Sequence, residues 1–311
     1  MPSRPTVSAI FISNRSDGGL EAAVGSVVDQ ATEPLELVVF GNGGEIEPPA
    51  AASDGRVQLR VGASAANLGV AGGRNAAAAL ATGEWLLFLD DDAVLRPGAL
   101  AAALETARSD ARVGAVAFRV IDPASGQTAV WLYPRPAEIW AEQPFEAPHV
   151  VGGGNLIRRE VFERLGGFWD GYFREMEEID FSWRLIDEGL KVLYDPRAAF
   201  EHVERTRRLY AYSVPSVLIM LWRLLPPGLA LRQTAVKLPL FGWRAVRHGE
   251  VGELLAGLRR AVSMLPRLRD ERATLRPETV SRLRRMHAGD GIGARLQWSL
   301  RANSGWPEAS G

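Results

Sequence analysis

The chain has 311 residues, of which 47% are hydrophobic and 23% are charged, and its formal net charge is −1. The composition is typical of a globular protein, and the length suits one large α/β domain with an appendage, or two ordinary domains. No cysteine is present, which excludes a disulfide framework, a cysteine-ligated metal centre and a catalytic thiol. The apolar run at 7–12 has the length of a strand, not of a signal sequence, and no apolar stretch is long enough to predict a membrane-spanning helix.

Strand-like and helix-like segments alternate through the first 200 residues. Apolar runs predict strands, while alanine-rich or amphipathic stretches that end at glycine predict helices. This order predicts an α/β fold with a mainly parallel sheet flanked by helices. In such sheets ligands bind beyond the carboxyl ends of the strands, where the Asn42 turn and Asp90-Asp91-Asp92 fall. The predicted strands are 7–13, 35–40, 57–61, 85–89, 113–121, 129–133 and 191–194, and the predicted helices are 20–30, 69–81, 97–108 and 178–188.

The second part of the chain differs in charge and in pattern. Residues 201–311 carry 19 Lys and Arg against 9 Asp and Glu, a net charge of +10, so residues 1–200 carry −11. Strand signals end near residue 205, and amphipathic helices with arginine among leucine, valine and tryptophan follow. These helices are predicted at 210–223, 230–247 and 251–268.

We therefore divide the chain into a sheet domain at 1–204 and a basic helical region at 205–311. The helical region has two interpretations: it packs on the sheet domain, or it docks on an anionic membrane surface through arginine and aromatic side chains. Trp222 and Trp243 favour docking. No nucleic-acid-binding motif accompanies the positive charge, so we expect no nucleic-acid partner. We expect a cytoplasmic protein, bound peripherally at the inner face of the membrane if the docking interpretation holds.

Asp90-Asp91-Asp92 follow the fourth predicted strand. Three adjacent carboxylates repel one another unless a cation lies among them, and Mg²⁺ or Mn²⁺ takes oxygen ligands and bridges to substrate phosphates. The structural alternatives are a solvated acidic loop and an N-cap for the next helix. Just upstream, the glycine-rich segment 67–75 opens a helix whose free backbone N–H groups attract anions, and Arg74 adds positive charge. We therefore favour a metal–diphosphate site.

A second group of polar residues lies further along the chain. Glu177, Glu178 and Asp180 crowd the first turn of the helix predicted at 178–188, where the helix dipole alone favours negative charge. A carboxylate cluster beside a cleft is also how a general base is built. His202 follows the last predicted strand and is a candidate third metal ligand, although a lone histidine is more often structural.

The order of these motifs resembles the family 2 glycosyltransferases of the GT-A fold, near their rhamnosyltransferase-like and galactofuranosyltransferase-like branches. The resemblance runs from about residue 7 to residue 202, roughly two thirds of the chain. A GT-A domain is a Rossmann-like sheet flanked by helices, so the basic helical region would be an appendage. The motifs that carry the resemblance are 67–75, 88–92, 152–159, 166–168 and 177–180.

The resemblance implies a role for each of these residues. Glu178, at a position where relatives usually carry Asp, would be the catalytic base, with Glu177 as its rival. Asp90, Asp92 and His202 would ligate the metal. Nucleotide-sugar contacts are implied for Asn42, Asn67, Gly69, Arg74, Asp90 and Asp91, and acceptor contacts for Gly153, Gly154, Trp169 and Asp180.

One departure from the family pattern leaves the nucleobase open. Relatives usually carry Asp-Asn after the second strand, whereas this chain carries Gly41-Asn42, so the donor is a dTDP-, UDP- or GDP-sugar. The resemblance implies an inverting enzyme that uses Mn²⁺ or Mg²⁺ and transfers a sugar to a carbohydrate or lipid-linked acceptor, as in cell-envelope synthesis. The alternatives are a sugar-phosphate nucleotidyltransferase, for which segment 13–19 is only a weak phosphate loop, and a non-catalytic membrane-associated scaffold.

Overall fold

The structure is a computed structural model that describes residues 6–14, 19–53, 55–130, 133, 135–202 and 210–288. The strands are β1 Val7–Ser13, β2 Leu35–Asn42, β3 Val57–Ser64, β4 Trp85–Leu89, β5 Ala93–Leu95, β6 Val113–Ile121, β7 Thr128–Val130, β8 Phe145–Ala147, β9 Gly154–Arg158 and β10 Lys191–His202. They form one ten-stranded sheet in the order β3-β2-β1-β4-β9-β6-β10-β5, and β7 pairs with β6 while β8 pairs with β10.

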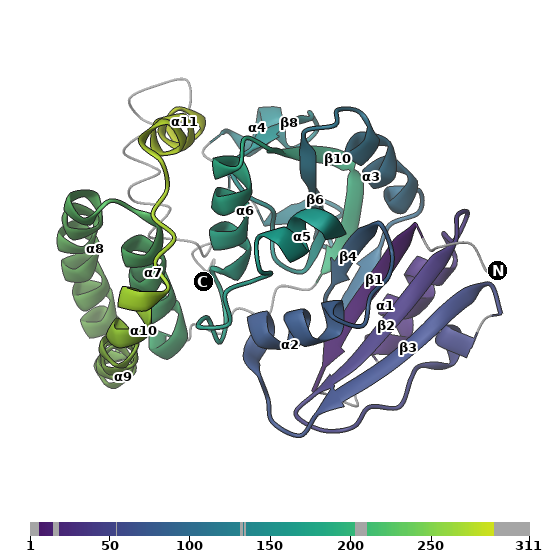
Figure 1. Cartoon of the computed structure of the whole chain (residues 1–311), viewed down its shortest axis with the longest axis horizontal. Coiled ribbons are helices and arrows are strands. Elements are labelled where there is room, and N and C mark those ends of the chain that lie inside the picture. The colour runs from purple at the N-terminus through teal and green to yellow at the C-terminus, as the bar shows by residue number, and fades with distance from the viewer. Residues whose placement is uncertain are drawn as a thin grey trace.

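Helices flank this sheet, and a further group of helices lies to one side of it (Figure 1). A short 3₁₀ helix spans Ala50–Ser53. The α-helices are α1 Gly19–Val28, α2 Gly69–Ala78, α3 Ala99–Arg108, α4 Ala137–Trp140, α5 Arg159–Arg164, α6 Glu177–Asp187, α7 Tyr210–Leu224, α8 Pro227–Arg247, α9 Val251–Ser263, α10 Leu265–Asp270 and α11 Pro277–Ala288.

The parallel half of the sheet consists of β3, β2, β1 and β4. The strands β1, β2 and β4 are rich in apolar residues and buried almost throughout, as expected for strands that are covered on both faces. This confirms the predicted α/β fold. Because the strands run in the same direction, their carboxyl ends meet at one edge of the sheet, where Asn42 ends β2 and Asp90 follows β4.

One central strand was not predicted. β9 lies between β4 and β6 and is antiparallel to both, so the sheet is not parallel throughout. Its sequence follows Gly152-Gly153, and glycine is a weak strand former, which hid the strand. Leu89 pairs in register with Gly154, and the Asp90 N–H donates to the Gly153 carbonyl at 2.9 Å. β9 therefore places the glycine segment directly beside the aspartate cluster.

The last strand is longer than predicted. Pro196 has no N–H to donate and suggested an end near residue 194, but a register shift between Asp195 and Ala199 accommodates the proline and β10 continues to His202. The end of β10 pairs antiparallel with β5, and His202 lies opposite Ala93. This pairing carries His202 to the aspartate cluster.

Four phenylalanine rings pack together between the sheet and the helices. Phe88 comes from β4, Phe162 from α5, Phe168 from the following loop and Phe181 from α6, and their centroids lie 5.0 to 5.5 Å apart. All four are buried, and aromatic pairs of this kind contribute about 0.5–1.5 kcal/mol each beyond their buried area. The cluster fixes the first half of α6 relative to β4.

Helices α7, α8 and α9 have a small apolar core of their own, formed by Val214, Leu218, Phe241, Ala245 and Leu254. The three helices predicted in this region are confirmed, but the third ends early at Ser263, and α10 follows it with Pro266 in its first turn. Helix α11 was not predicted. Within the residues that the structure describes, no helix has the length and apolar character needed to span a membrane.

Candidate active site

Asp90, Asp92 and His202 come together at the carboxyl edge of the sheet. One ligand atom from each lies within 4.8 Å of the other two, and His202 Nε2 lies 3.1 Å from Asp92 Oδ1. Two carboxylates and an imidazole are a donor set that suits Mn²⁺, and Mg²⁺ less well because it prefers oxygen. The residues therefore fit a divalent metal ion. The Asp91 carboxylate accepts a hydrogen bond from the Ser13 hydroxyl at the end of β1 instead.

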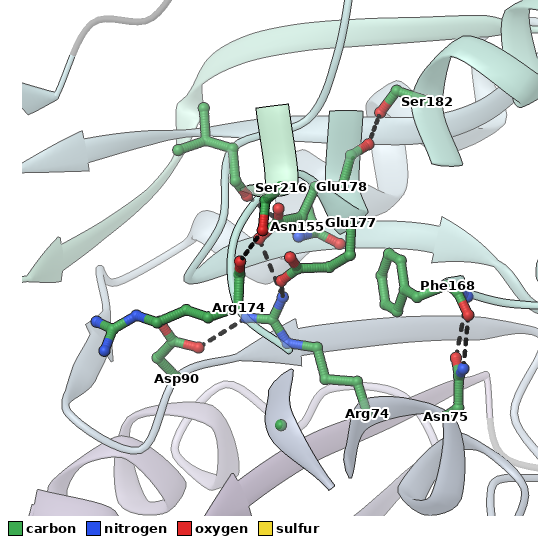
Figure 2. A network of polar contacts seen from close by, with 12 residues as sticks. Arg74, Asn75, Asp90, Asn155, Phe168, Arg174, Glu177, Glu178, Ser182 and Ser216 are labelled. Carbon is green, nitrogen blue, oxygen red and sulfur yellow. Dashed lines mark hydrogen bonds and ion pairs between the residues drawn. The ribbon is translucent and has the colours of Figure 1, made fainter. Parts of the chain in front are cut away.

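Arg74 joins this group to the carboxylates of α6 (Figure 2). Its Nη2 lies 2.8 Å from Asp90 Oδ1, and its Nη1 lies 3.1 Å from Glu178 Oε1 and 3.3 Å from Glu177 Oε1. Arg74 is only 3% exposed. Burial lowers the pKa of its guanidinium, but the negative charges of Asp90, Glu178 and Glu177 outweigh burial and raise that pKa above its ordinary value. Arg74 is therefore a permanent cation that three carboxylates share.

The two glutamates of α6 differ in exposure. Glu177 is 1% exposed and its Oε2 has no hydrogen-bond partner. Burial, and then the charge of Glu178, raise the pKa of the Glu177 carboxyl well above its ordinary value, although Arg74 opposes them. The Glu178 side chain is 12% exposed and that of Asp90 is 35% exposed. Glu178 is therefore the more accessible of the two glutamates.

The turn before α6 is strained. Glu175 and Met176 have φ angles of 67° and 74°, which cost non-glycine residues energy and cluster at functional sites. The Ser216 hydroxyl of α7 donates to the Arg174 carbonyl at 2.8 Å, as Figure 2 shows. Burial also raises the pKa of Glu175. Sequence patterns missed this turn because neither residue is a glycine.

The glycine segment beside β9 leaves room for the carboxylates. A Cβ atom at Gly152 would collide with the Glu178 carboxylate, and one at Gly153, where φ is +88°, would lie 3.1 Å from Asp90 Oδ2. Gly154 lies against the ring of Phe200 in the same way. Side chains at these three positions would displace the site residues, so glycine has a structural reason there. Gly153 and Gly154, but not Gly152, were predicted as acceptor contacts, and that role stays a prediction.

The start of α2 differs from expectation. The predicted phosphate site required free N–H groups, but Leu68 N–H donates to Asn42 Oδ1 at 2.9 Å, and Gly69 N–H donates to Asn67 Oδ1 at 2.9 Å. Val70 N–H donates to the Phe173 carbonyl at 2.8 Å. Because these three donors already have partners, Asn42 and Asn67 hold the helix start in place. Arg74, in turn, binds carboxylates of the protein itself.

Asp180 and Trp169, the other two predicted acceptor contacts, are both buried. Asp180 is fully buried, and its carboxylate accepts from Arg184 Nε at 2.7 Å, from Arg223 Nη1 at 2.7 Å and from the Tyr172 hydroxyl at 3.1 Å. Trp169 is 7% exposed and its indole N–H donates to Glu271 after α10. With their polar atoms occupied, both residues connect the sheet domain to the C-terminal helices, and their role as acceptor contacts stays a prediction.

Solved glycosyltransferases share this architecture. The mannosyltransferase PcManGT from Pyrobaculum calidifontis, in complex with GDP-Man and Mn²⁺, aligns with 97% of this chain and 85% of its own, with a TM-score of 0.56 and 20% identity. TarS from S. aureus, in complex with UDP-GlcNAc, aligns with 70% of this chain and 65% of its own, with a TM-score of 0.53 and 14% identity. The fold is therefore that of the GT-A glycosyltransferases.

The sequence identifies the family. Residues 10–166, half of the chain, match the family described as Glycosyl transferase family 2, and the chain belongs to this family. The pre-mycofactocin glycosyltransferase of Mycobacterium tuberculosis is 30% identical over 147 residues, which are 45% of this chain and 31% of that protein; the chain thus matches about a third of that relative's length. The N-acetylglucosaminyl-diphospho-decaprenol L-rhamnosyltransferase of the same organism is 26% identical over 218 residues, 59% of this chain and 71% of that one.

Proposed function

We propose that the chain is an inverting, divalent-metal-dependent glycosyltransferase that moves a sugar from a nucleoside diphosphate sugar to an acceptor hydroxyl. One observation carries the proposal: the buried Arg74 lies between Asp90, at 2.8 Å, and Glu178, at 3.1 Å. A candidate metal ligand and a candidate base are thereby held by the same guanidinium group. Membership of Glycosyl transferase family 2 supports the reaction class.

In this mechanism Glu178 accepts the proton of the acceptor hydroxyl. The acceptor oxygen forms a bond to the anomeric carbon while the bond from that carbon to the diphosphate oxygen breaks on the opposite face, so the configuration inverts and a nucleoside diphosphate leaves. A base in this position typically contributes about 10²–10⁴ in rate. Asp90, Asp92 and His202 would hold the metal, which supplies charge stabilisation to the departing diphosphate.

Glu178 is a better base than its neighbour Glu177. Glu177 is nearly inaccessible, and its raised pKa favours the protonated form, which cannot accept a proton. We therefore assign Glu177 to positioning and Glu178 to proton transfer.

Two further observations concern the donor nucleobase and the acceptor. The Asn42 side-chain amide forms hydrogen bonds with the backbone at the start of α2, and position 41 carries a glycine in place of a carboxylate. These residues therefore do not distinguish a thymidine, uridine or guanosine donor. The rhamnosyltransferase relative is named for a decaprenyl-diphosphate-linked substrate, which supports a lipid-linked or other cell-envelope acceptor. Such an acceptor would place the enzyme at the inner face of the membrane.

A binding and turnover experiment tests the reaction class. Calorimetric titration with UDP, dTDP and GDP, each with and without Mn²⁺, should identify one nucleotide whose binding needs the metal, and the matching nucleotide sugar should then release nucleoside diphosphate in the presence of an acceptor. Pyrophosphate release from a nucleoside triphosphate and a sugar phosphate would instead identify a nucleotidyltransferase. If neither nucleotide nor Mn²⁺ binds, the chain is a non-catalytic scaffold and the proposal is wrong.

A further inference from the structure

Exposed apolar side chains are concentrated on the C-terminal helices. Among the described residues, nine of the thirteen large apolar side chains that are exposed lie between Leu231 and Leu265, on α8, α9 and α10. The most exposed are Val246 at 71%, Val262 at 63% and Leu231 at 60%. Single exposed leucines are ordinary, but such a concentration marks an interaction surface.

On α8 these side chains share one side of the helix. Leu231, Leu238 and Val246 fall within about 80° of one another around the axis, and all three are exposed. The adjoining side of the helix packs inward through Ala230 and Phe241. Helix α8 is therefore apolar on part of its exposed surface as well as on its buried side, a pattern that water alone does not favour.

Helix α9 continues the pattern. Val251, Leu255 and Val262 are exposed and fall within about 40° of one another around the axis. Its exposed acidic residue, Glu253, is more than about 150° away from them, whereas Arg259 lies beside the row and is exposed. We call the exposed apolar residues of the two helices, together with the exposed Arg232, Arg247 and Arg259, the α8–α9 face.

The exposed charges of this face are positive, which favours an anionic partner. The exposed charged side chains of α8 are Arg232 and Arg247, and Arg247 Cζ lies 5.4 Å from the ring centroid of Trp243, which is 57% exposed. Residues 227–269 carry eight Lys and Arg against two Glu. Apolar and aromatic side chains bordered by arginine are the combination that binds anionic headgroups and inserts shallowly below them.

We propose that the α8–α9 face docks on an anionic phospholipid bilayer and lies flat in its interface. Docking of this kind requires only shallow insertion of side chains and no spanning helix. Helices α7 and α9 connect to the site, because Tyr212 of α7 stacks on Phe173 at 5.3 Å and Arg260, on the side of α9 away from its exposed apolar row, lies 5.4 Å from the same ring. Phe173 precedes the strained turn that leads to Glu177 and Glu178. A docked enzyme would thus hold its candidate base at a fixed position relative to the membrane.

Vesicle binding by the full-length protein tests this surface without donor or acceptor, so its result is independent of the transfer reaction. Co-sedimentation is measured with phosphatidylcholine vesicles that contain or lack phosphatidylglycerol. We expect binding only to the anionic vesicles, weakened by salt, and a loss on the order of 30-fold when Arg232→Gln and Arg247→Gln are combined.

The apolar part is tested by the double variant Leu231→Glu with Val246→Glu, which should lose at least about tenfold in vesicle affinity. Ile139→Glu is the matched control, because Ile139 on α4 is 55% exposed but lies outside the face; it should bind like the wild type. Unchanged thermal unfolding of the variants shows that they fold. Equal binding to both vesicle types, or full binding by the double variant, overturns the proposal. So does sedimentation equilibrium that reveals a dimer which the double variant dissociates, because a second copy would then cover the face.

Discussion

Arg74 and Glu178 form a buried ion pair, with 3.1 Å between Nη1 and Oε1, although 104 positions separate them in the chain. The same guanidinium binds Asp90 through its other terminal nitrogen at 2.8 Å. Arginine suits this position because its planar fork binds two carboxylates at once and keeps its charge when buried. The pair therefore sets the distance between the proposed base and the proposed metal ligands.

The proposed base is tested by Glu178→Gln. This change keeps the shape of the side chain but removes the proton acceptor, so turnover should fall by about 10²–10⁴ while calorimetric binding of the nucleotide stays unchanged. Glu188→Gln, just after α6 at an exposed position, is the control and should turn over normally. Near-normal turnover by Glu178→Gln would show that another group accepts the proton.

The protonation of Glu177 has a consequence for stability. Burial, followed by the charge of Glu178, raises the pKa of this carboxyl in the folded protein. In the unfolded chain its pKa is about 4.3. At a pH between these two pKa values, the folded protein therefore keeps a proton on Glu177 that the unfolded chain has released. The contribution of Glu177 to the free energy of unfolding therefore decreases as the pH rises through this range.

Glu177→Gln copies the protonated form and removes this pH dependence. Its Tm should equal that of the wild type near about pH 4 and exceed it near about pH 7.5, as measured by circular dichroism. Glu160→Gln, whose ion pair with Arg164 is exposed, should show no such pH-dependent gain. A lower Tm for Glu177→Gln at neutral pH would instead mean that Glu177 is ionised and paired with Arg74.

The candidate metal group is tested by removing its ligands. Asp92→Asn and His202→Gln each delete one donor of the set that lies within 4.8 Å, and each should weaken Mn²⁺ binding by more than about tenfold in calorimetry. Asp91→Asn is the matched control, because that carboxylate accepts from Ser13 instead. Equal affinities in all three variants would place the metal elsewhere.

The junction with the C-terminal helices depends on Asp180. Asp180→Asn leaves the buried guanidinium groups of Arg184 and Arg223 without their counter-charge, so urea unfolding should show a loss of about 3–5 kcal/mol. Combining it with Arg223→Met should cost less than the sum of the two single changes, with a coupling of about 0.5–3 kcal/mol. The exposed Glu160→Gln should cost less than about 0.5 kcal/mol. Additive losses would show that Asp180 and Arg223 do not stabilise each other.

The sequence by itself determined the parallel half of the sheet and the cluster of aspartates at its carboxyl edge. β1, β2 and β4 are continuous apolar runs, and burial on both faces requires such runs whatever surrounds them. The aspartates follow β4 directly, so their position at the carboxyl edge of the sheet can be predicted from the neighbouring sequence alone. The amphipathic pattern of α7, α8 and α9 is local in the same way, since it repeats with the period of one helix.

Tertiary structure decided which side chains meet. His202 reaches Asp92, 110 positions away, only because β10 continues past Pro196 and pairs with β5. Arg74 contacts Asp90, Glu177 and Glu178 because β9 inserts antiparallel beside β4 and the phenylalanine cluster packs α6 against β4. Side-chain periodicity indicates which face of a single helix or strand is buried. Which side chains meet when they are about 100 residues apart in the chain depends on strand order, register and packing. The same packing turned Asp180 and Trp169 inward, to the junction with the C-terminal helices.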